Sequence, residues 1–236
     1  MSSFYYIDRS NIELSDVVFN EEVAKQIEDF LLEQKFKEKL LQYKLPIANK
    51  ILLHGATGCG KTMTAKAVAK HLNKKLVIVN LATIISSKLG ETSKNIDLLF
   101  KEAQYEGMVL FFDEFDSLGQ IRDYDNKDNS EMKRVVNAIL QLIDHFPQKS
   151  ILMAATNQIQ MIDEALKRRF EMQLAFTNPS NETLDIFYNK IISAFPENYQ
   201  KIERIYNTSF AEAKNSALYQ IKKNIINIEL NSQKTS

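Results

Sequence analysis

One glycine-rich loop is the feature that most constrains how this chain can fold. The 236 residues include only 6 glycines, and three of them, Gly55, Gly58 and Gly60, lie in one short stretch. An apolar run, Lys50–His54, precedes the stretch, and an alanine- and lysine-rich helical segment, Thr62–Leu72, follows it. Glycine adopts backbone angles that other residues avoid. The pattern therefore predicts a strand, a tight loop and a helix, in that order.

The loop from Gly55 to Thr62 reads G-A-T-G-C-G-K-T and fits G-x-x-x-x-G-K-[ST]. In this pattern several backbone N–H groups surround an anion, and the N-terminus of the next helix adds a partial positive charge. We expect Lys61 to reach the β- and γ-phosphates of a nucleotide, and the Thr62 hydroxyl to ligate Mg²⁺. The residues assigned to nucleotide binding here are Gly55, Ala56, Thr57, Gly58, Cys59, Gly60, Lys61, Thr62 and Met63.

Short apolar strands alternate with helical stretches along most of the chain. Runs that are apolar on both faces and separated by helices indicate a parallel sheet between helical layers. The predicted strands are 50–54, 76–80, 109–112, 151–155 and 172–176, and the predicted helices between and before them are 21–43, 62–72, 92–105 and 130–146. After residue 176 a proline interrupts the chain and the periodicity becomes helical, including a stretch near 210–228. We predict an N-terminal extension (1–20), an α/β core (21–177), a helical lid (178–231) and a disordered tail (232–236).

Polar side chains end two further predicted strands. Val109–Phe112 leads directly into Asp113 and Glu114. We expect Asp113 to hold Mg²⁺ and Glu114 to orient or deprotonate an attacking water. The next strand ends in an amide, Asn157, that could hydrogen-bond the same water or a γ-phosphate. An asparagine in an ordinary turn is the alternative interpretation.

Two adjacent arginines, Arg168 and Arg169, precede the last predicted strand. Charged pairs are usually solvated surface. Arginine is also the residue that stabilises charge on a transferring phosphoryl group, often across a subunit boundary.

Taken together, the phosphate loop, the D-E pair, the A-T-N strand end and the R-R-F segment resemble the AAA family of ATPases, most nearly its protein-remodelling branch. The resemblance extends from Ser15 to Phe176. It implies a three-layer α/β/α P-loop NTPase with a parallel five-stranded sheet of order 5-1-4-3-2 and a small C-terminal helical lid.

The same resemblance implies roles for particular residues. Asn157 would be the sensor, and Arg168 and Arg169 would be the fingers that reach the ATP of a neighbouring subunit. Val17 and Val18 would contribute to the adenine pocket. Active members usually form ring or spiral hexamers, so a homo-oligomer is expected.

One segment departs from the family pattern. Where the resemblance implies a substrate-gripping pore loop, ordinarily an aromatic residue, an apolar residue and glycine, this chain has Lys88, Leu89 and Gly90. Lysine cannot grip polypeptide through the apolar contacts that a ring makes. We assign these three residues to substrate contact and expect a loose grip or substrates with acidic segments. We expect no recognition domain in the short N-terminal extension and therefore expect a partner protein to select the substrate.

Charge and composition restrict the partners and the location. The 30 Lys and Arg residues balance 30 Asp and Glu, so no global field recruits nucleic acid or an anionic membrane, although a local patch can. The single Cys59 excludes an intramolecular disulfide and fits a reducing compartment. No apolar run approaches the roughly 18 residues of a membrane span, and no signal peptide is recognised. We expect a cytoplasmic protein.

The sequence thus predicts Mg²⁺-ATP-dependent hydrolysis of ATP in an oligomeric ring, coupled to remodelling or unfolding of a protein substrate or partner. A nucleic-acid motor or loader on the same fold is one alternative, which the zero net charge and the lack of basic–aromatic interleaving disfavour. A phosphotransferase is a second, although Glu114 and Asn157 fit water activation better. A nucleotide-gated scaffold without turnover is a third, which the intact set of catalytic residue types disfavours.

Overall fold

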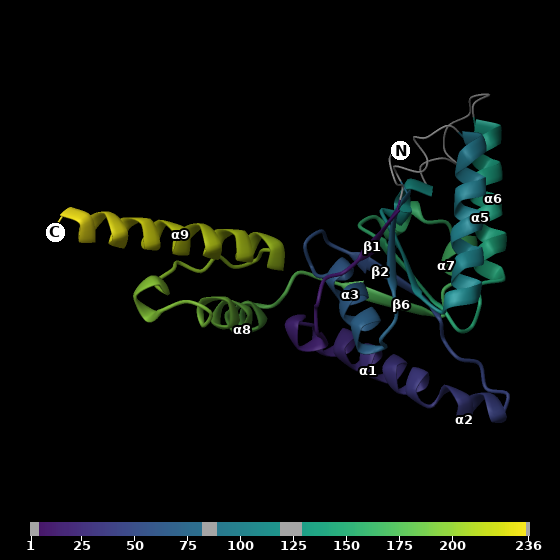
Figure 1. Cartoon of the computed structure of the whole chain (residues 1–236), viewed down its shortest axis with the longest axis horizontal. Coiled ribbons are helices and arrows are strands. Elements are labelled where there is room, and N and C mark those ends of the chain that lie inside the picture. The colour runs from purple at the N-terminus through teal and green to yellow at the C-terminus, as the bar shows by residue number, and fades with distance from the viewer. Residues whose placement is uncertain (1–4, 82–88, 119–128, 235–236) are drawn as a thin grey trace. The chain divides into compact units, whose positions relative to one another are not determined.

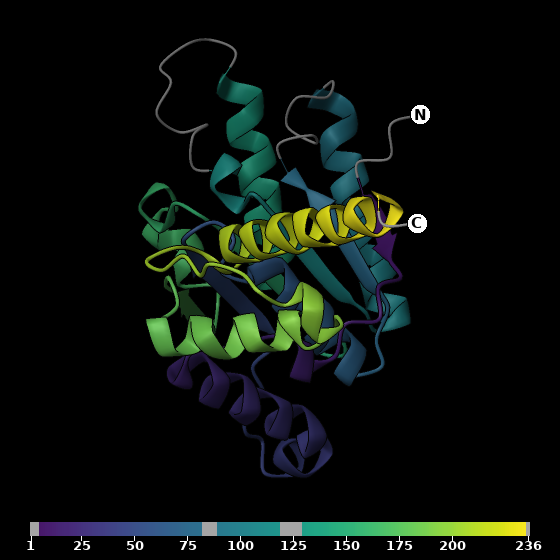
Figure 2. The same ribbon diagram turned by 90° about the vertical axis from the view of Figure 1, so that its left-hand side faces the viewer.

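The computed structural model describes residues 5–81, 89–118 and 129–234, which divide into two compact units. The core unit comprises the chain up to Gly55 and the segment Lys61–Phe176. The helical unit comprises Ala56–Gly60 and the chain from Thr177 onward. Figures 1 and 2 show the elements of each unit in two views.

A mostly parallel, six-stranded sheet forms the centre of the core unit, with the order β1-β3-β4-β5-β2-β6. Its strands are β1 (Tyr5–Asp8), β2 (Lys50–Gly55), β3 (Leu76–Asn80), β4 (Val109–Asp113), β5 (Ile151–Thr156) and β6 (Met172–Phe176). The five strands β3-β4-β5-β2-β6 pair in parallel. This confirms the order 5-1-4-3-2 that was expected for the five strands predicted from the sequence.

The predicted number of strands is wrong by one, because β1 adds an antiparallel edge strand beside β3. Tyr5 pairs with Val79, and Asp8 pairs with Leu76. The ion pair between Asp8 and Lys66, with 2.8 Å between Oδ1 and Nζ, connects the end of β1 to the helix Lys61–His71. A four-residue strand with exposed central side chains carries little periodic signal. Its pairing with β3 is what makes it a strand.

Helices cover both faces of the sheet. The core unit contains α1 (Glu21–Lys35), α2 (Lys37–Gln42), α3 (Lys61–His71), α5 (Leu89–Glu106), α6 (Asn129–Asp144) and α7 (Glu164–Lys167), with 3-10 turns η1 (Leu14–Asp16), η2 (Phe115–Leu118) and η3 (Ile159–Met161). Figure 1 shows α5 and α6 side by side on one face and α3 on the other. The predicted helix over 21–43 is interrupted at Phe36, whose backbone angles (φ −99°, ψ 15°) leave the helical range and separate α1 from α2.

One large core cluster lies between the sheet and the α5–α6 layer. A run of aromatic rings connects its elements: Phe100 meets Phe112 at 6.0 Å between centroids, and Phe115 meets Phe170 edge-on at 5.5 Å. All four rings are buried, so packing explains these phenylalanines without a binding role.

The helical unit is built from α8 (Asn181–Ile192), the 3-10 turn η4 (Glu197–Tyr199) and α9 (Phe210–Lys234). Ser180 caps α8 by accepting the N–H of Thr183 at 3.2 Å, next to the proline that predicted the boundary. Its small core consists of Leu184, Tyr188, Ala213 and Ala217. α9 continues to Lys234, into the segment expected to be a disordered tail. None of the described helices combines the length and the apolar composition of a membrane span.

Candidate nucleotide and catalytic site

The phosphate loop has the backbone that its glycines were expected to provide. Gly55, Gly58 and Gly60 have positive φ angles of 128°, 77° and 103°, which L-residues rarely adopt. A Cβ at Gly55 would lie 1.9 Å from the Phe176 carbonyl oxygen on β6. The Lys61 ammonium lies within the core unit, 2.7 Å from the Gly55 carbonyl oxygen to which it donates. The loop therefore requires glycine for conformation and for space.

Residues 56–60 of this loop pack within the helical unit, although the sequence prediction placed the whole loop in the core. Ala211 at the start of α9 donates its N–H to the Gly58 carbonyl oxygen at 3.2 Å. A Cβ at Gly58 would lie 2.8 Å from both the Ala211 Cβ and the Ser209 Oγ. The buried Cys59 has its Sγ 3.4 Å from Asn178 Oδ1. Sequence reasoning missed these contacts because they join segments far apart in the chain.

The acidic pair lies at the end of β4, as predicted. Glu114 has a positive φ of 55°, which is unusual for a residue with a Cβ and is typical of strained functional positions. Asp113 Oδ1 accepts the Glu114 N–H at 3.0 Å, and the Glu114 carbonyl oxygen accepts the Ser117 hydroxyl at 2.7 Å. Glu114 is exposed and Asp113 is partly buried.

Asn157 follows β5 directly and is exposed. The residue before it, Thr156, is buried and donates its hydroxyl to Asp116 Oδ1 at 2.8 Å. This contact ties the end of β5 to the turn after the acidic pair, so Asn157 and Glu114 belong to neighbouring strand ends. The sequence offered no signal for Asp116, because its partner is far away in the chain.

The structure distinguishes the two arginines. Arg168 is exposed. Arg169 is partly buried and forms an ion pair with Asp144 at the end of α6, with Nε 2.8 Å from Oδ1 and Nη2 3.1 Å from Oδ2. It also donates to the Ala165 carbonyl oxygen at 2.5 Å. The guanidinium of Arg169 is therefore engaged within its own subunit.

The remaining predicted residues lie in or beside α3, begin α5 or fall outside the described ranges. Thr62 and the exposed Met63 are in the first turn of α3. Val17 ends η1, which packs against α3, and Val18 follows it. Lys88 lies outside the described residues. Leu89 and Gly90 begin α5.

His54 on β2 precedes the loop, and its surroundings disfavour a charge. Burial lowers the pKa of His54 below its ordinary value of 6.5, and the positive charges of Lys61 and Lys167 lower that pKa further. A neutral imidazole at this position adds no further positive charge beside Lys61.

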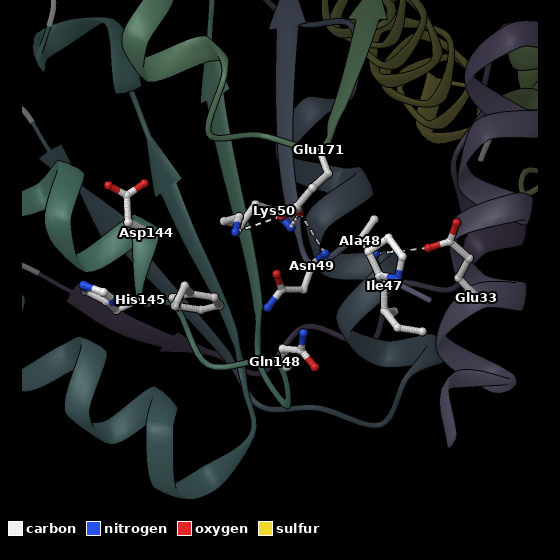
Figure 3. A pocket seen from close by; sticks show the side chains of 11 residues that line it. Glu33, Ile47, Ala48, Asn49, Lys50, Asp144, His145, Gln148 and Glu171 are labelled. Atoms are coloured by element: carbon white, nitrogen blue, oxygen red, sulfur yellow. Dashed lines mark hydrogen bonds and ion pairs between the residues drawn. The ribbon is translucent and has the colours of Figure 1, made fainter. Parts of the chain in front are cut away.

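The opposite edge of the sheet holds a pocket of about 570 Å³, shown in Figure 3. Glu171 makes three of the polar contacts in this pocket. Its Oε2 accepts the backbone N–H groups of Asn49 at 3.0 Å and Lys50 at 2.7 Å, and its Oε1 pairs with Lys50 Nζ at 2.8 Å. Its polar side chains are largely used to hold the strand starts together. The lining includes Asp144, the partner of Arg169.

Comparison with known proteins agrees with the geometry. Residues 51–178 match the family described as "ATPase family associated with various cellular activities (AAA)". An uncharacterized AAA family ATPase of Sinorhizobium fredii, y4kL, is 34% identical over 215 residues, which cover 90% of this chain and 65% of that protein. A putative 26S proteasome regulatory subunit homolog of Methanothermobacter thermautotrophicus is 29% identical over 191 residues, covering 80% of this chain and 50% of that protein. This chain therefore spans between half and two thirds of these relatives.

Solved structures show the same fold. The crystal structure of the FIGL-1 AAA domain aligns with a TM-score of 0.71 at 22% identity, covering 90% of this chain and 72% of that one. The structure of that domain in complex with ADP aligns with a TM-score of 0.71 at 23% identity. With its motifs at the strand ends that the family requires and a family match over residues 51–178, this chain belongs to the AAA family of P-loop ATPases.

Proposed function

We propose that this chain hydrolyses ATP with Mg²⁺ as part of a homo-oligomeric ring, with a hexamer as the expected form, and couples hydrolysis to remodelling of a protein substrate or adaptor. The observation that carries the proposal is the set of polar residues at the carboxyl ends of β2, β4 and β5. Ligands of open parallel sheets bind beyond these ends. The loop with three left-handed glycines begins at the same edge.

The loop N–H groups and Lys61 bind the β- and γ-phosphates. Thr62 and Asp113 fit Mg²⁺, since it prefers hydroxyl and carboxylate oxygens, and two protein ligands suffice where phosphates and waters supply the rest. Among the described residues, no group of three or more His, Cys, Asp or Glu could hold a metal alone, which agrees with a metal that enters with its nucleotide. Bound Mg²⁺ supplies charge neutralisation on the phosphates. Val17 and Val18 contact the base.

Glu114 accepts a proton from the attacking water, and Asn157 orients that water. The water oxygen bonds to the γ-phosphorus as the bond to the β,γ-bridging oxygen breaks, giving ADP and phosphate. The exposed Arg168 stabilises the transferring phosphoryl group in the neighbouring subunit. Such arginines contribute roughly 10³–10⁵ in rate in other NTPases, so an isolated subunit is expected to be nearly inert.

The names of two related proteins support the coupling of hydrolysis to protein remodelling. Its relatives include a proteasome regulatory subunit homolog and an ATP-dependent zinc metalloprotease of the FtsH type, which is 33% identical over 179 residues. We expect unfolded, acidic casein to stimulate ATP turnover, because Lys88, at the expected pore-loop position, suits substrates with acidic segments. An unchanged turnover would count against this coupling without affecting the hydrolytic assignment.

Glu114→Gln with saturating ATP is the decisive experiment. The amide cannot accept the proton, so hydrolysis should fall by about 10²–10⁴-fold while ATP stays bound. Light scattering after size exclusion should show an ATP-dependent oligomer that persists longer than that of the wild type. Glu106→Gln, the same change at the opposite edge of the sheet, is the control and should leave both properties unchanged. A Glu114→Gln monomer that hydrolyses ATP at the wild-type rate would refute the mechanism.

A further inference from the structure

Several lysines gather at one edge of the core unit. Other lysines of this unit pair with acids, as in Lys50–Glu171, Lys66–Asp8, Lys75–Glu102, Lys101–Asp97 and Lys167–Glu164. Five others share a different environment and form what we call the cationic edge: Lys35, Lys37, Lys39, Lys74 and Lys149. No ion pair to a carboxylate is present for these five within the described ranges.

Backbone carbonyls hold three of these ammonium groups close together. Lys37 donates to the Gln148 carbonyl oxygen. Lys74 donates to the next carbonyl, that of Lys149, at 2.8 Å, and Lys149 donates to the Tyr105 carbonyl oxygen at 2.7 Å. Burial lowers the pKa of Lys37 and of Lys74, and each is lowered further by the neighbouring ammonium, Lys74 and Lys149 respectively. The cluster therefore carries mutual repulsion that an external anion would relieve.

Exposed apolar side chains lie among the lysines. Phe36 is 53% exposed and Tyr43 is 67% exposed. The ammonium of Lys35 lies 5.6 Å from the Phe36 ring centroid, and that of Lys39 lies 5.3 Å from the Tyr43 centroid. Leu32 and Leu41 are also exposed, and α2 buries no residue of its own. In Figure 1, α2 lies beyond the end of α1, at the lower border of the core unit.

The junction of α1 and α2 also contains a hollow of about 430 Å³. Its polar lining comprises Gln34, Lys35, Lys37, Glu38, Lys39 and Gln42. Three ammonium groups and two amides offer hydrogen-bond donors, against a single carboxylate, that of Glu38, in the lining. This donor set matches a phosphate group.

We propose that the cationic edge, with the apolar residues of the α1–α2 junction, docks the protein on a phospholipid membrane surface rich in anionic headgroups. Lysines beside an anionic bilayer attract its headgroups, while aromatic and leucine side chains enter the boundary between headgroups and acyl chains. Lysine is depleted in the cores of protein interfaces, which disfavours a protein partner of ordinary chemistry.

Nucleic acid is the other polyanion to consider. The sequence expectation that basic and aromatic residues do not interleave is wrong at this surface. However, each exposed ring already has a lysine of its own chain over one face, and the exposed leucines have no partner in a nucleic acid that binds by stacking and phosphate contacts. The combination favours lipid.

Sedimentation with vesicles tests the proposal on the full chain. Vesicles of phosphatidylcholine with about 30 mol % phosphatidylglycerol should bind the protein, pure phosphatidylcholine should not, and binding should weaken as salt is raised. The Lys35→Gln/Lys39→Gln variant should bind at least tenfold more weakly, and Phe36→Ser/Tyr43→Ser should weaken binding without changing the salt dependence. Lys223→Gln is the matched control, since Lys223 covers the Tyr219 ring of α9 in the same way, at 4.8 Å; it should bind as the wild type does.

Three results would overturn the proposal. One is equal binding to neutral and anionic vesicles, or none to either. Another is complete displacement from the vesicles by a short single-stranded DNA, which would indicate a nucleic-acid surface. The third is a changed oligomer size in the variants, which would make this edge a subunit contact. ATP turnover and circular dichroism of each variant establish that it is folded, and neither depends on membrane binding.

Discussion

The two edges of the parallel sheet use polar side chains in opposite ways. At the amino edge, where the strands begin, Glu171 accepts two backbone N–H groups, and the buried Ser150 hydroxyl donates to the Ala103 carbonyl oxygen at 2.6 Å. At the carboxyl edge, Glu114 and Asn157 are exposed, and the backbone enters left-handed conformations at the loop glycines and at Glu114 itself. Glu171 and Ser150 therefore stabilise the fold. The exposed Glu114 and Asn157 stay available for a ligand, and the left-handed backbone at Glu114 costs stability.

Single alanine substitutions at Arg168 and Arg169 should give the largest difference in activity. Arg168→Ala is expected to lower kcat by about 10³-fold, equivalent to about 4 kcal/mol, because the exposed arginine that we propose as a finger is lost. Arg169→Ala should lower kcat by no more than about tenfold, since Arg169 works through its ion pair with Asp144, and Asp144→Ala should reproduce the Arg169→Ala value.

Mixing two kinds of variant subunit tests whether the proposed arginine finger acts on the ATP of a neighbouring subunit. Subunits with Arg168→Ala and Arg169→Ala, combined with Lys61→Ala subunits, should recover part of the hydrolysis that each lacks alone. Equal losses in the two single arginine variants would remove the distinction between them.

Alanine substitutions at Gly55 and at Gly107 compare the carboxyl and amino edges of the sheet. Gly55→Ala brings a Cβ to within 1.9 Å of a backbone oxygen, so we expect a loss of more than about 3 kcal/mol in unfolding free energy, or no folded protein. Gly107→Ala, at the amino edge with φ 64°, meets nothing nearer than 3.5 Å and should cost about 1–2 kcal/mol from its backbone conformation alone. Urea denaturation measures both. Similar losses would mean that space at Gly55 is not limiting.

Glu171→Ala tests the assignment of the amino edge to stability. Removing a carboxylate that holds two strand starts should lower the unfolding free energy by about 1–3 kcal/mol. ATP turnover per folded molecule should remain that of the wild type at temperatures well below the unfolding midpoint. A turnover loss at full folding would show that the edge near Asp144 takes part in catalysis.

The smallest effect concerns pH. The pKa of His54 is lowered in the folded protein, so its contribution to stability is present above the ordinary value of 6.5 and is lost as the pH falls below it toward the folded-state pKa. His54→Gln should therefore reduce the fall in melting temperature between pH 7.5 and about pH 5.5. The wild type and the variant should show parallel curves above that window. Parallel curves throughout would exclude His54 as the titrating group.

Much of the carboxyl edge was predictable because its residues are local in sequence. A strand end and the residue after it are neighbours in the chain, so the amino-acid pattern alone sufficed to place Asp113, Glu114 and Asn157 at the ends of their strands. The order of the five parallel strands came from the family resemblance. The edge strand β1 could not be predicted, because only its pairing with β3 gives four half-exposed residues a strand geometry.

The phosphate loop, the acidic pair and the alternation of strands and helices were predictable from the amino-acid pattern, since periodicity and glycine placement act over a few residues. The folded structure was needed to show which arginine is engaged in its own subunit, because Asp144 and Arg169 meet across 25 positions of chain. It was also needed to show that Gly58 packs against Ala211 and that Lys37, Lys74 and Lys149 of the cationic edge are held by backbone carbonyls. These are long-range contacts, and a charge or a glycine acquires its role there from neighbours that the linear sequence does not place beside it.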